Sequence, residues 1–223
     1  MRSSYPTRKW SHPEGYKYLA PWTNAVLLRF LIRKFTEGLP RSEYRTKTQL
    51  DDAGRSVISN IEEGFKRPTT REYLDFIGFS QGSLEEVKGL FRQVHQDGFL
   101  VSRPGSFLAD IGIDLREFKG KLEEIKGNSP LNVSLNILYS PLKSLKGADL
   151  TLQMMMELIN KTDYLLRQLV KSLENSITKE DVLSPYDRWL GRQMEQRRDE
   201  EKDFDEELKR IVERAKSEKG EPR

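Results

Sequence analysis

The two histidines are the residues best suited to acid–base or metal chemistry, because the chain contains no cysteine. A di-iron helical bundle needs a Glu-x-x-His pair on each of two helices. Neither His12 nor His95 has a glutamate three residues before it. The absence of cysteine also excludes thiolate catalysis and disulfides. The sequence therefore predicts no metal site and no cofactor.

Other catalytic patterns are also missing from the chain. Helical ribonucleases of the HEPN type carry an arginine followed four to six residues later by histidine, but Arg92 lies only three residues before His95. There is no P-loop, no nucleophile elbow and no zinc-ligand spacing. We expect His95 near a helix C-terminus, where the helix dipole favours its charge. We therefore expect no catalytic residue, and an uncharacterised nuclease is the enzymatic alternative.

Positive charge is concentrated in the first part of the 223-residue chain. Residues 1–48 carry ten basic and three acidic residues, a net charge of +7, although the whole chain has only +3. Such asymmetry favours a polyanionic partner, while basic residues that merely solubilise helix surfaces are the alternative. Lysine and arginine on one side of a helical protein bind phosphates without reading base sequence. The predicted nucleic-acid-binding residues are Arg29, Arg33, Lys34, Arg41, Arg45, Lys47, Arg55, Lys66, Arg67 and Arg71.

Three aromatic residues lie near these cations in the sequence. Trp22, Tyr44 and Tyr73 have the ring systems that stack on unpaired bases. Their spacing also suits a helical core or an interface between subunits, and we favour that interpretation.

Apolar residues at steps of three and four predict four long helices, over about 21–37, 43–65, 69–97 and 149–177. Pro21 suits a first helical turn, and Thr69 with Glu72 forms a capping-box pattern. The chain between residues 102 and 147 contains glycine and proline and is expected to be a long, partly helical connection. One helix is expected within it, from Phe107 to Ile125. The predicted class is all-α, with these four helices in an antiparallel up-down bundle.

Small and polar residues within the helices carry further predictions. Gly78, Gly82 and Gly89 each disfavour a helix interior, so we expect another helix to approach closely there. Gly82-Ser83 is accordingly interpreted as a packing contact. Asn60 and Glu63 are expected to hydrogen-bond a neighbouring helix or a loop.

The two ends of the chain differ from its middle. We expect an N-terminal arm over residues 1–20, a bundle over 21–177 and a charged tail over 178–223. Residues 192–223 carry ten basic and eleven acidic residues, which is typical of a solvated helix or a disordered tail. The N-terminus lacks the apolar segment of a signal peptide, and no apolar run is long enough to span a membrane. The expected location is cytoplasmic.

The chain resembles a known family in polar residues at fixed spacings as well as in its apolar period. They are Gln49-Leu50, Ala53, Ser56, Asn60-Ile61, Glu63-Gly64, Tyr73, Phe76 and Gly82-Ser83-Leu84-Glu85-Glu86. In these residues the chain resembles the bacterial four-helix bundle family typified by proteins encoded in intervening sequences of 23S ribosomal RNA genes. The relatives of that family include the accessory variability determinant of diversity-generating retroelements. Arg55-Ser56, residues 12–16 and residues 160–169 look closer still to the four helix bundle suffix subgroup.

The resemblance implies an antiparallel bundle without enzymatic activity that assembles as a homo-oligomer, in better-known members a pentamer. Retroelement members bind a reverse transcriptase and nucleic acid through a basic surface. The family-motif residues Asn60, Glu63, Gly64, Gly82 and Ser83 are expected to be structural. Many members carry a basic pair where this chain has Asp51-Asp52, a charge reversal that weakens the implied nucleic-acid binding. A self-assembling protein-interaction module is therefore the alternative function.

Overall fold

The computed structural model describes residues 14–125 and 135–176, and these are α-helices, 3-10 turns and loops without a β-strand. The predicted all-α class is therefore confirmed. Most of the expected N-terminal arm, including His12, and the charged tail over 178–223 lie outside the described residues. Within the described ranges, no helix combines the length and apolar character needed to cross a bilayer.

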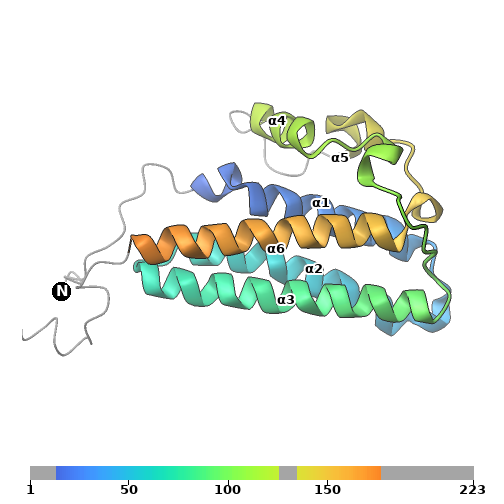
Figure 1. Cartoon of the computed structure of the whole chain (residues 1–223), viewed down its shortest axis with the longest axis horizontal. Helices are drawn as coiled ribbons and strands as arrows, with labels where there is room; N and C mark the ends of the chain where they lie inside the picture. Colours follow the sequence, from blue (N-terminus) through green and yellow to red (C-terminus); the bar gives the residue numbers. More distant parts are fainter. Residues whose placement is uncertain (1–13, 126–134, 177–223) are drawn as a thin grey trace, which may run out of the picture. The chain divides into compact units, whose positions relative to one another are not determined.

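Four long helices make up most of the described chain. They are α1 (Ala20–Glu37), α2 (Tyr44–Phe65), α3 (Thr70–Gln96) and α6 (Leu152–Asn175). Helix α2 packs along both α1 and α3, and α6 packs along both α1 and α3. Figure 1 shows the four helices side by side. Each long helix thus covers the apolar stripe of two others, which buries the periodic residues of the sequence.

Local signals explain where these helices begin. Pro21 occupies the first turn of α1, where its missing N–H group would have no helical partner. The Thr69 hydroxyl accepts a hydrogen bond from the backbone N–H of Glu72 at 3.2 Å. The same hydroxyl donates to the Glu72 carboxylate at 2.9 Å. Thr151 caps α6 in the same way through the Met154 N–H at 3.3 Å.

Buried polar bonds fix the register between helices. The Trp22 indole, 1% exposed, donates to the Glu62 carboxylate at 2.9 Å and so ties α1 to α2. The buried Ser80 hydroxyl donates to the Val57 carbonyl at 2.9 Å and ties α3 to α2. These bonds satisfy polar groups that burial would otherwise leave unpaired.

The connection between α3 and α6 holds α4 (Leu115–Ile125), α5 (Leu135–Leu138) and three 3-10 turns. A single helix from Phe107 to Ile125 was expected, and this prediction is wrong. Gly112 adopts a positive φ of 74°, which ends a 3-10 turn at Ile111 before α4 begins. Helix α4 then packs against α1.

Tyr139 anchors this connection from within. Its hydroxyl accepts the Asp114 N–H at 2.9 Å and donates to the Gly112 carbonyl at 3.1 Å. Burial, together with the nearby Glu117 carboxylate, raises the pKa of Tyr139 above its usual range. The hydroxyl therefore stays protonated and can serve both bonds.

Glycines permit close helix packing at positions other than those expected. A Cβ atom at Gly64 would lie 2.7 Å from the Phe76 Cβ atom, and one at Gly54 would lie 2.7 Å from Ile32 Cδ1. At Gly78, Gly82 and Gly89 a Cβ atom would meet nothing within 4 Å. The expected close approach at these three glycines is therefore wrong for the described chain, because they lie on the exposed face of α3.

Candidate nucleic-acid interface

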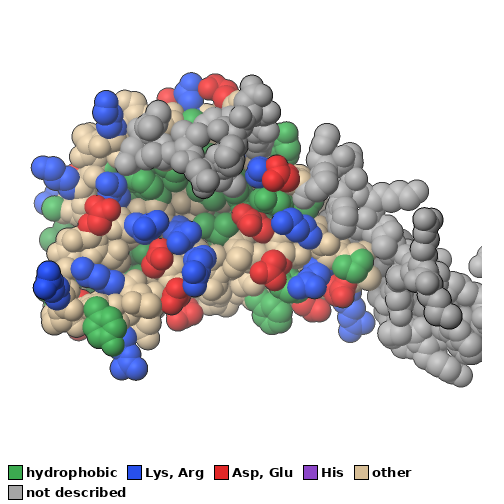
Figure 2. Space-filling view, turned by 180° about the vertical axis from the view of Figure 1, so that it is seen from behind, with side chains coloured by type: hydrophobic (Ala, Val, Ile, Leu, Met, Phe, Trp, Pro, Cys, Tyr) green, Lys and Arg blue, Asp and Glu red, His purple; other side chains and the backbone are tan. Residues whose placement is uncertain are grey.

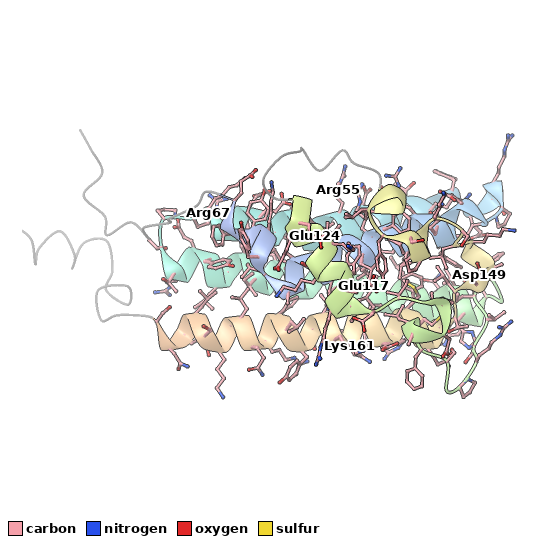
Figure 3. All side chains as sticks on the ribbon, turned by 90° about the horizontal axis from the view of Figure 1, so that it is seen from above. Arg55, Arg67, Glu117, Glu124, Asp149 and Lys161 are labelled. Atoms are coloured by element: carbon pink, nitrogen blue, oxygen red, sulfur yellow. The ribbon has the colours of Figure 1, made fainter. Side chains whose placement is uncertain are left out.

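Most of the predicted phosphate-binding cations fall into two groups near opposite ends of α2, whereas Arg29 and Arg55 lie level with its middle. The 22 residues of α2 span about 33 Å, so one phosphate-binding surface on the monomer would need to be long. Figure 3 labels Arg67 and Asp149 at opposite ends of the structure, with Arg55 between them. The structure therefore brings together only part of the predicted set.

The middle of α2 is neutral because its two aspartates pair with predicted cations. The Arg29 guanidinium donates to both carboxylate oxygens of Asp51, at 3.2 and 3.4 Å. Arg55 donates to Asp52 at 2.9 Å on the exposed surface of the same helix. The departure from the family pattern at Asp51-Asp52 thus cancels the charge of two candidates.

A group of basic side chains without ion pairs gathers where α1 ends and α2 begins. Gly147 in the connection packs here, since a Cβ atom on it would lie 2.6 Å from the Lys34 carbonyl oxygen. The Ser80–Val57 bond, with Gly64 packed against Tyr73 and Phe76, places position 92 of α3 level with position 45 of α2. We call this group the basic end, and it consists of Arg33, Arg41, Arg45, Lys47, Arg92 and Lys146.

No member of the basic end forms an ion pair with another described residue. Lys34 beside it is paired with Glu37 at 3.7 Å. Of the neighbouring acids, Glu43 accepts the Thr46 hydroxyl at 3.0 Å and Asp149 accepts the Lys146 N–H at 2.8 Å. Figure 2 shows the molecule from behind, so the end where α1 meets α2 lies on the left, and Lys and Arg predominate there. The cations there are available to a polyanion.

Tyr44 is the one aromatic candidate that the basic end exposes. Its side chain is 71% exposed and lies at the start of α2, next to Arg45. Trp22 and Tyr73 are each only 1% exposed and belong to the core, as favoured from the sequence. Only Tyr44 of the three can stack on a base without unfolding the helices.

At the opposite end of α2, aromatic rings hold two of the predicted cations. Lys66 lies 5.4 Å from the centre of the Tyr16 ring, and Arg67 lies 4.2 Å from that of Phe76. Arg67 also pairs with Glu63 at 3.7 Å. Of the predicted cations here, only Arg71 has no charged or aromatic partner in the described chain.

Tyr16 at that end carries a perturbed hydroxyl. Burial raises the pKa of Tyr16 to about 12, and the Glu62 and Glu14 carboxylates add to this effect. The Glu62 and Glu14 carboxylates already place negative charge near Tyr16, which makes this end the weaker candidate for phosphate.

A hollow of about 670 Å³ lies in the connection next to the basic end. Arg103 and Ser144 line it together with the Asp110 and Asp149 carboxylates. Asp110 accepts the Phe107 N–H at 2.8 Å, as part of the connection's own turn. Acids and bases are mixed in this lining, so we exclude the hollow from the phosphate interface.

The family-motif residues have varied surroundings. Gly64 packs against Tyr73 and Phe76, whereas Gly82 is open and the Ser83 hydroxyl bonds only to the Phe79 carbonyl of its own helix. The Asn60 side chain makes no hydrogen bond within the described ranges, and the Glu63 carboxylate pairs only with Arg67 at the end of its own helix. The expected role of Asn60 and Glu63 in bonding a neighbouring helix or loop is therefore wrong for this part of the chain.

Sequence reasoning missed the residues that do tie the helices together, namely Glu62, Ser80 and Gly54. It also missed Arg92 and Lys146 at the basic end. The short turn between α2 and α3 could have indicated Arg92, because it lets the end of α3 lie beside the start of α2. No sequence signal indicates Lys146, since only the docking of Gly147 places it there.

His95 has a structural position at the end of α3. Its Nδ1 atom donates a hydrogen bond to the Leu100 carbonyl at 2.8 Å and holds the chain as it leaves the helix. In the described ranges, no group of three or more His, Asp or Glu side chains is placed to hold a metal ion.

A comparison of the sequence with known protein families tests the resemblance. Residues 17–106 match the 23S rRNA-intervening sequence protein family. The family predicted from the motifs of α2 and α3 is therefore confirmed over this segment, which spans α1 to the start of the connection. The finer assignment to the suffix subgroup stays a prediction. No curated protein and no solved structure shows a significant match to the chain.

Proposed function

We propose that this protein is a non-catalytic accessory or scaffold protein that binds the phosphates of RNA or single-stranded DNA through the basic end. The observation that supports this proposal is the gathering of six unpaired cations from α1, α2, α3 and the connection. These charges come from α1, the turn before α2, α2, α3 and the connection, and they form no ion pair within the described ranges, while the neighbouring charges of α2 are neutralised.

The chemistry of this surface suits backbone binding. Arginine and lysine release counterions from a nucleic acid when they neutralise its phosphates, and this supplies affinity without base identity. The exposed Tyr44 ring adds a surface on which one unpaired base can stack. The name of the matched family refers to ribosomal RNA genes, so RNA is the first substrate to test.

Salt-dependent binding of the full chain to a fluorescent structured RNA and a single-stranded DNA tests the proposal. Replacing Arg41, Arg45 and Lys47 by glutamine should flatten the dependence of log K on log salt by about 2, since each phosphate contact with a single strand contributes about 0.7. The control variant replaces Lys66, Arg71 and Lys171, which changes net charge equally but lies at the opposite end. No binding at ~50 mM salt, or equal losses in both variants, would refute the proposal.

A second candidate function, self-association, is favoured by the exposed face of α3. Gly78, Gly82 and Gly89 leave open space there, and the neighbouring Phe79 ring is 59% exposed. A face with small residues and an exposed aromatic ring suits contact with a second copy. Sedimentation of the wild-type protein against Phe79→Ser would test it, and a monomer at micromolar concentration would contradict it.

We also propose that α1, α2, α3 and α6 form the antiparallel up-down bundle implied by the family. In its support, short turns join α1 to α2 and α2 to α3. The Leu152 N–H donates to the Val101 carbonyl at 2.9 Å, so α6 starts beside the end of α3. Spin-label distances between the helix ends would test this arrangement.

A further inference from the structure

A cavity of about 560 Å³ opens between α1, α4 and α6, away from the basic end. Its volume lies within the range of sites that hold small molecules. The α4 and α6 walls come from residues beyond the segment 17–106 that the family shares. The cavity is therefore a feature of the connection and α6, independent of the function proposed above.

The cavity wall combines apolar side chains with polar ones. Leu115 of α4 and Leu165 of α6 supply the apolar wall. Asn24 of α1 also lines the cavity, although its residue is only 5% exposed. Its side-chain amide makes no hydrogen bond with any other described residue. The amide is not one of the buried atoms that lack a partner, so it reaches the surface of the cavity and can hydrogen-bond a bound molecule.

The charged groups of the lining are all cationic. Arg116, Lys119 and Lys161 line the cavity, and no acidic side chain does. Lys161 pairs with Glu157 at 2.5 Å and Lys119 with Glu123 at 3.9 Å, but both glutamates lie outside the lining. Arg116 has no ion pair in the described ranges. Figure 3 shows Lys161 on α6 where α4 crosses nearby.

Asp114 is the acid that interacts with these cations from the edge of α4. Its carboxylate accepts backbone N–H groups of Arg116 and Glu117 at 2.7 and 2.9 Å. Both bonds fall on Oδ1 at the helix start, and the carboxylate offsets part of the positive charge of Arg116 and Lys161 from outside the lining.

We infer that this cavity binds a small amphipathic acid, with an aliphatic or aromatic body between Leu115 and Leu165 and an anionic group facing Arg116 and Lys161. The apolar wall supplies burial, the cations supply charge complementarity, and the Asn24 amide supplies a directional hydrogen bond. A carboxylate and a phosphate monoester share this chemistry.

Fluorescence of 1-anilinonaphthalene-8-sulfonate, an aromatic acid, provides the probe with the full chain. Its emission should rise on binding, and octanoate or octyl phosphate should displace it. Octanol and octylamine share the apolar body but lack the negative charge, and they should displace it poorly. The stronger competitor of the two acids identifies the preferred anionic group. Equal displacement by octanol, or the absence of saturable binding, would overturn the inference.

Matched variants locate the binding. Lys161→Gln and Arg167→Gln each break an i, i+4 ion pair on α6, at 2.5 and 2.8 Å, but only Lys161 lines the cavity. Lys161→Gln should weaken octanoate binding about tenfold, and Arg167→Gln should leave it unchanged. On α4, Arg116→Gln removes a cation of the lining that has no ion pair within the described ranges, and Lys121→Gln removes one outside the lining that pairs with Glu124 at 3.2 Å. Equal losses within both pairs would overturn the assignment to this cavity.

Discussion

Replacing Gly147 by alanine tests whether the connection docks on α1 as described. A Cβ atom at this position would lie 2.6 Å from the Lys34 carbonyl oxygen and 3.2 Å from the Phe35 Cα atom. Both are backbone atoms of the last turns of α1, so no side-chain rotation can relieve the clash. The connection or the end of α1 must therefore move.

The expected loss of stability follows from two opposing terms. Overpacking of this kind costs about 1–3 kcal/mol. Alanine also restricts the unfolded chain, and this stabilises the folded protein by about 0.4–1 kcal/mol. We therefore expect a net loss of about 1–2 kcal/mol, which lowers Tm by about 2–8 °C in a chain of this size.

The same change at Gly89 is a matched control with the opposite expected sign. A Cβ atom there would meet nothing within 4 Å, and alanine is about 1 kcal/mol better than glycine inside a helix. Gly89→Ala should therefore raise Tm in the same calorimetric or circular-dichroism melt. A Gly147→Ala variant as stable as wild type would refute the docking, and with it the position of Lys146 in the basic end.

Three further predictions concern charge. Asp51→Asn with Asp52→Asn should release their arginine partners and steepen the salt dependence of RNA binding, by about 0.7 per new phosphate contact, as measured by anisotropy. Because the folded-state pKa of Tyr16 is raised from 10.0 to about 12, its contribution to stability is intact below pH 10 and is lost as the pH rises towards 12. Tyr16→Phe should reduce this alkaline loss in denaturant melts. Backbone hydrogen bonds lower the pKa of Asp114, so its support of α4 is present above the ordinary carboxyl range and is lost as the pH falls through the lowered value. Asp114→Ala should remove that acid dependence from hydrogen exchange in the first turn of α4.

The long helices were predictable because their signals are local. The apolar period, Pro21 at the start of α1 and Thr69 with Glu72 at the start of α3 act within one or two turns. The break at Gly112 was missed because a periodic pattern of leucines and isoleucines continues through it. Only the positive φ of that glycine separates the two elements.

The candidate site depends on contacts that the sequence does not encode locally. Gly82 was expected to pack because glycine is unfavourable in a helix, but the packing positions are Gly54 and Gly64. Which glycine faces a neighbour is decided by helix rotation, and the Ser80–Val57 bond shows that rotation only in the folded chain. The basic end likewise requires the register between helices and the docking of the connection.

The ion pairs of Asp51 and Asp52 show what these two residues do in the folded chain. As a sequence feature, the pair simply lowers positive charge in the segment that defines the family. In the structure, Asp51 pairs across helices with Arg29, and Asp52 pairs along α2 with Arg55. Since each aspartate neutralises one arginine, the positive charge is interrupted along α2 and unpaired cations stay at the end where α1 and α2 meet. If the basic end binds nucleic acid as proposed, its short surface favours contact with a few phosphates at a loop or strand end over contact along a continuous duplex, because its cations do not extend along the helix.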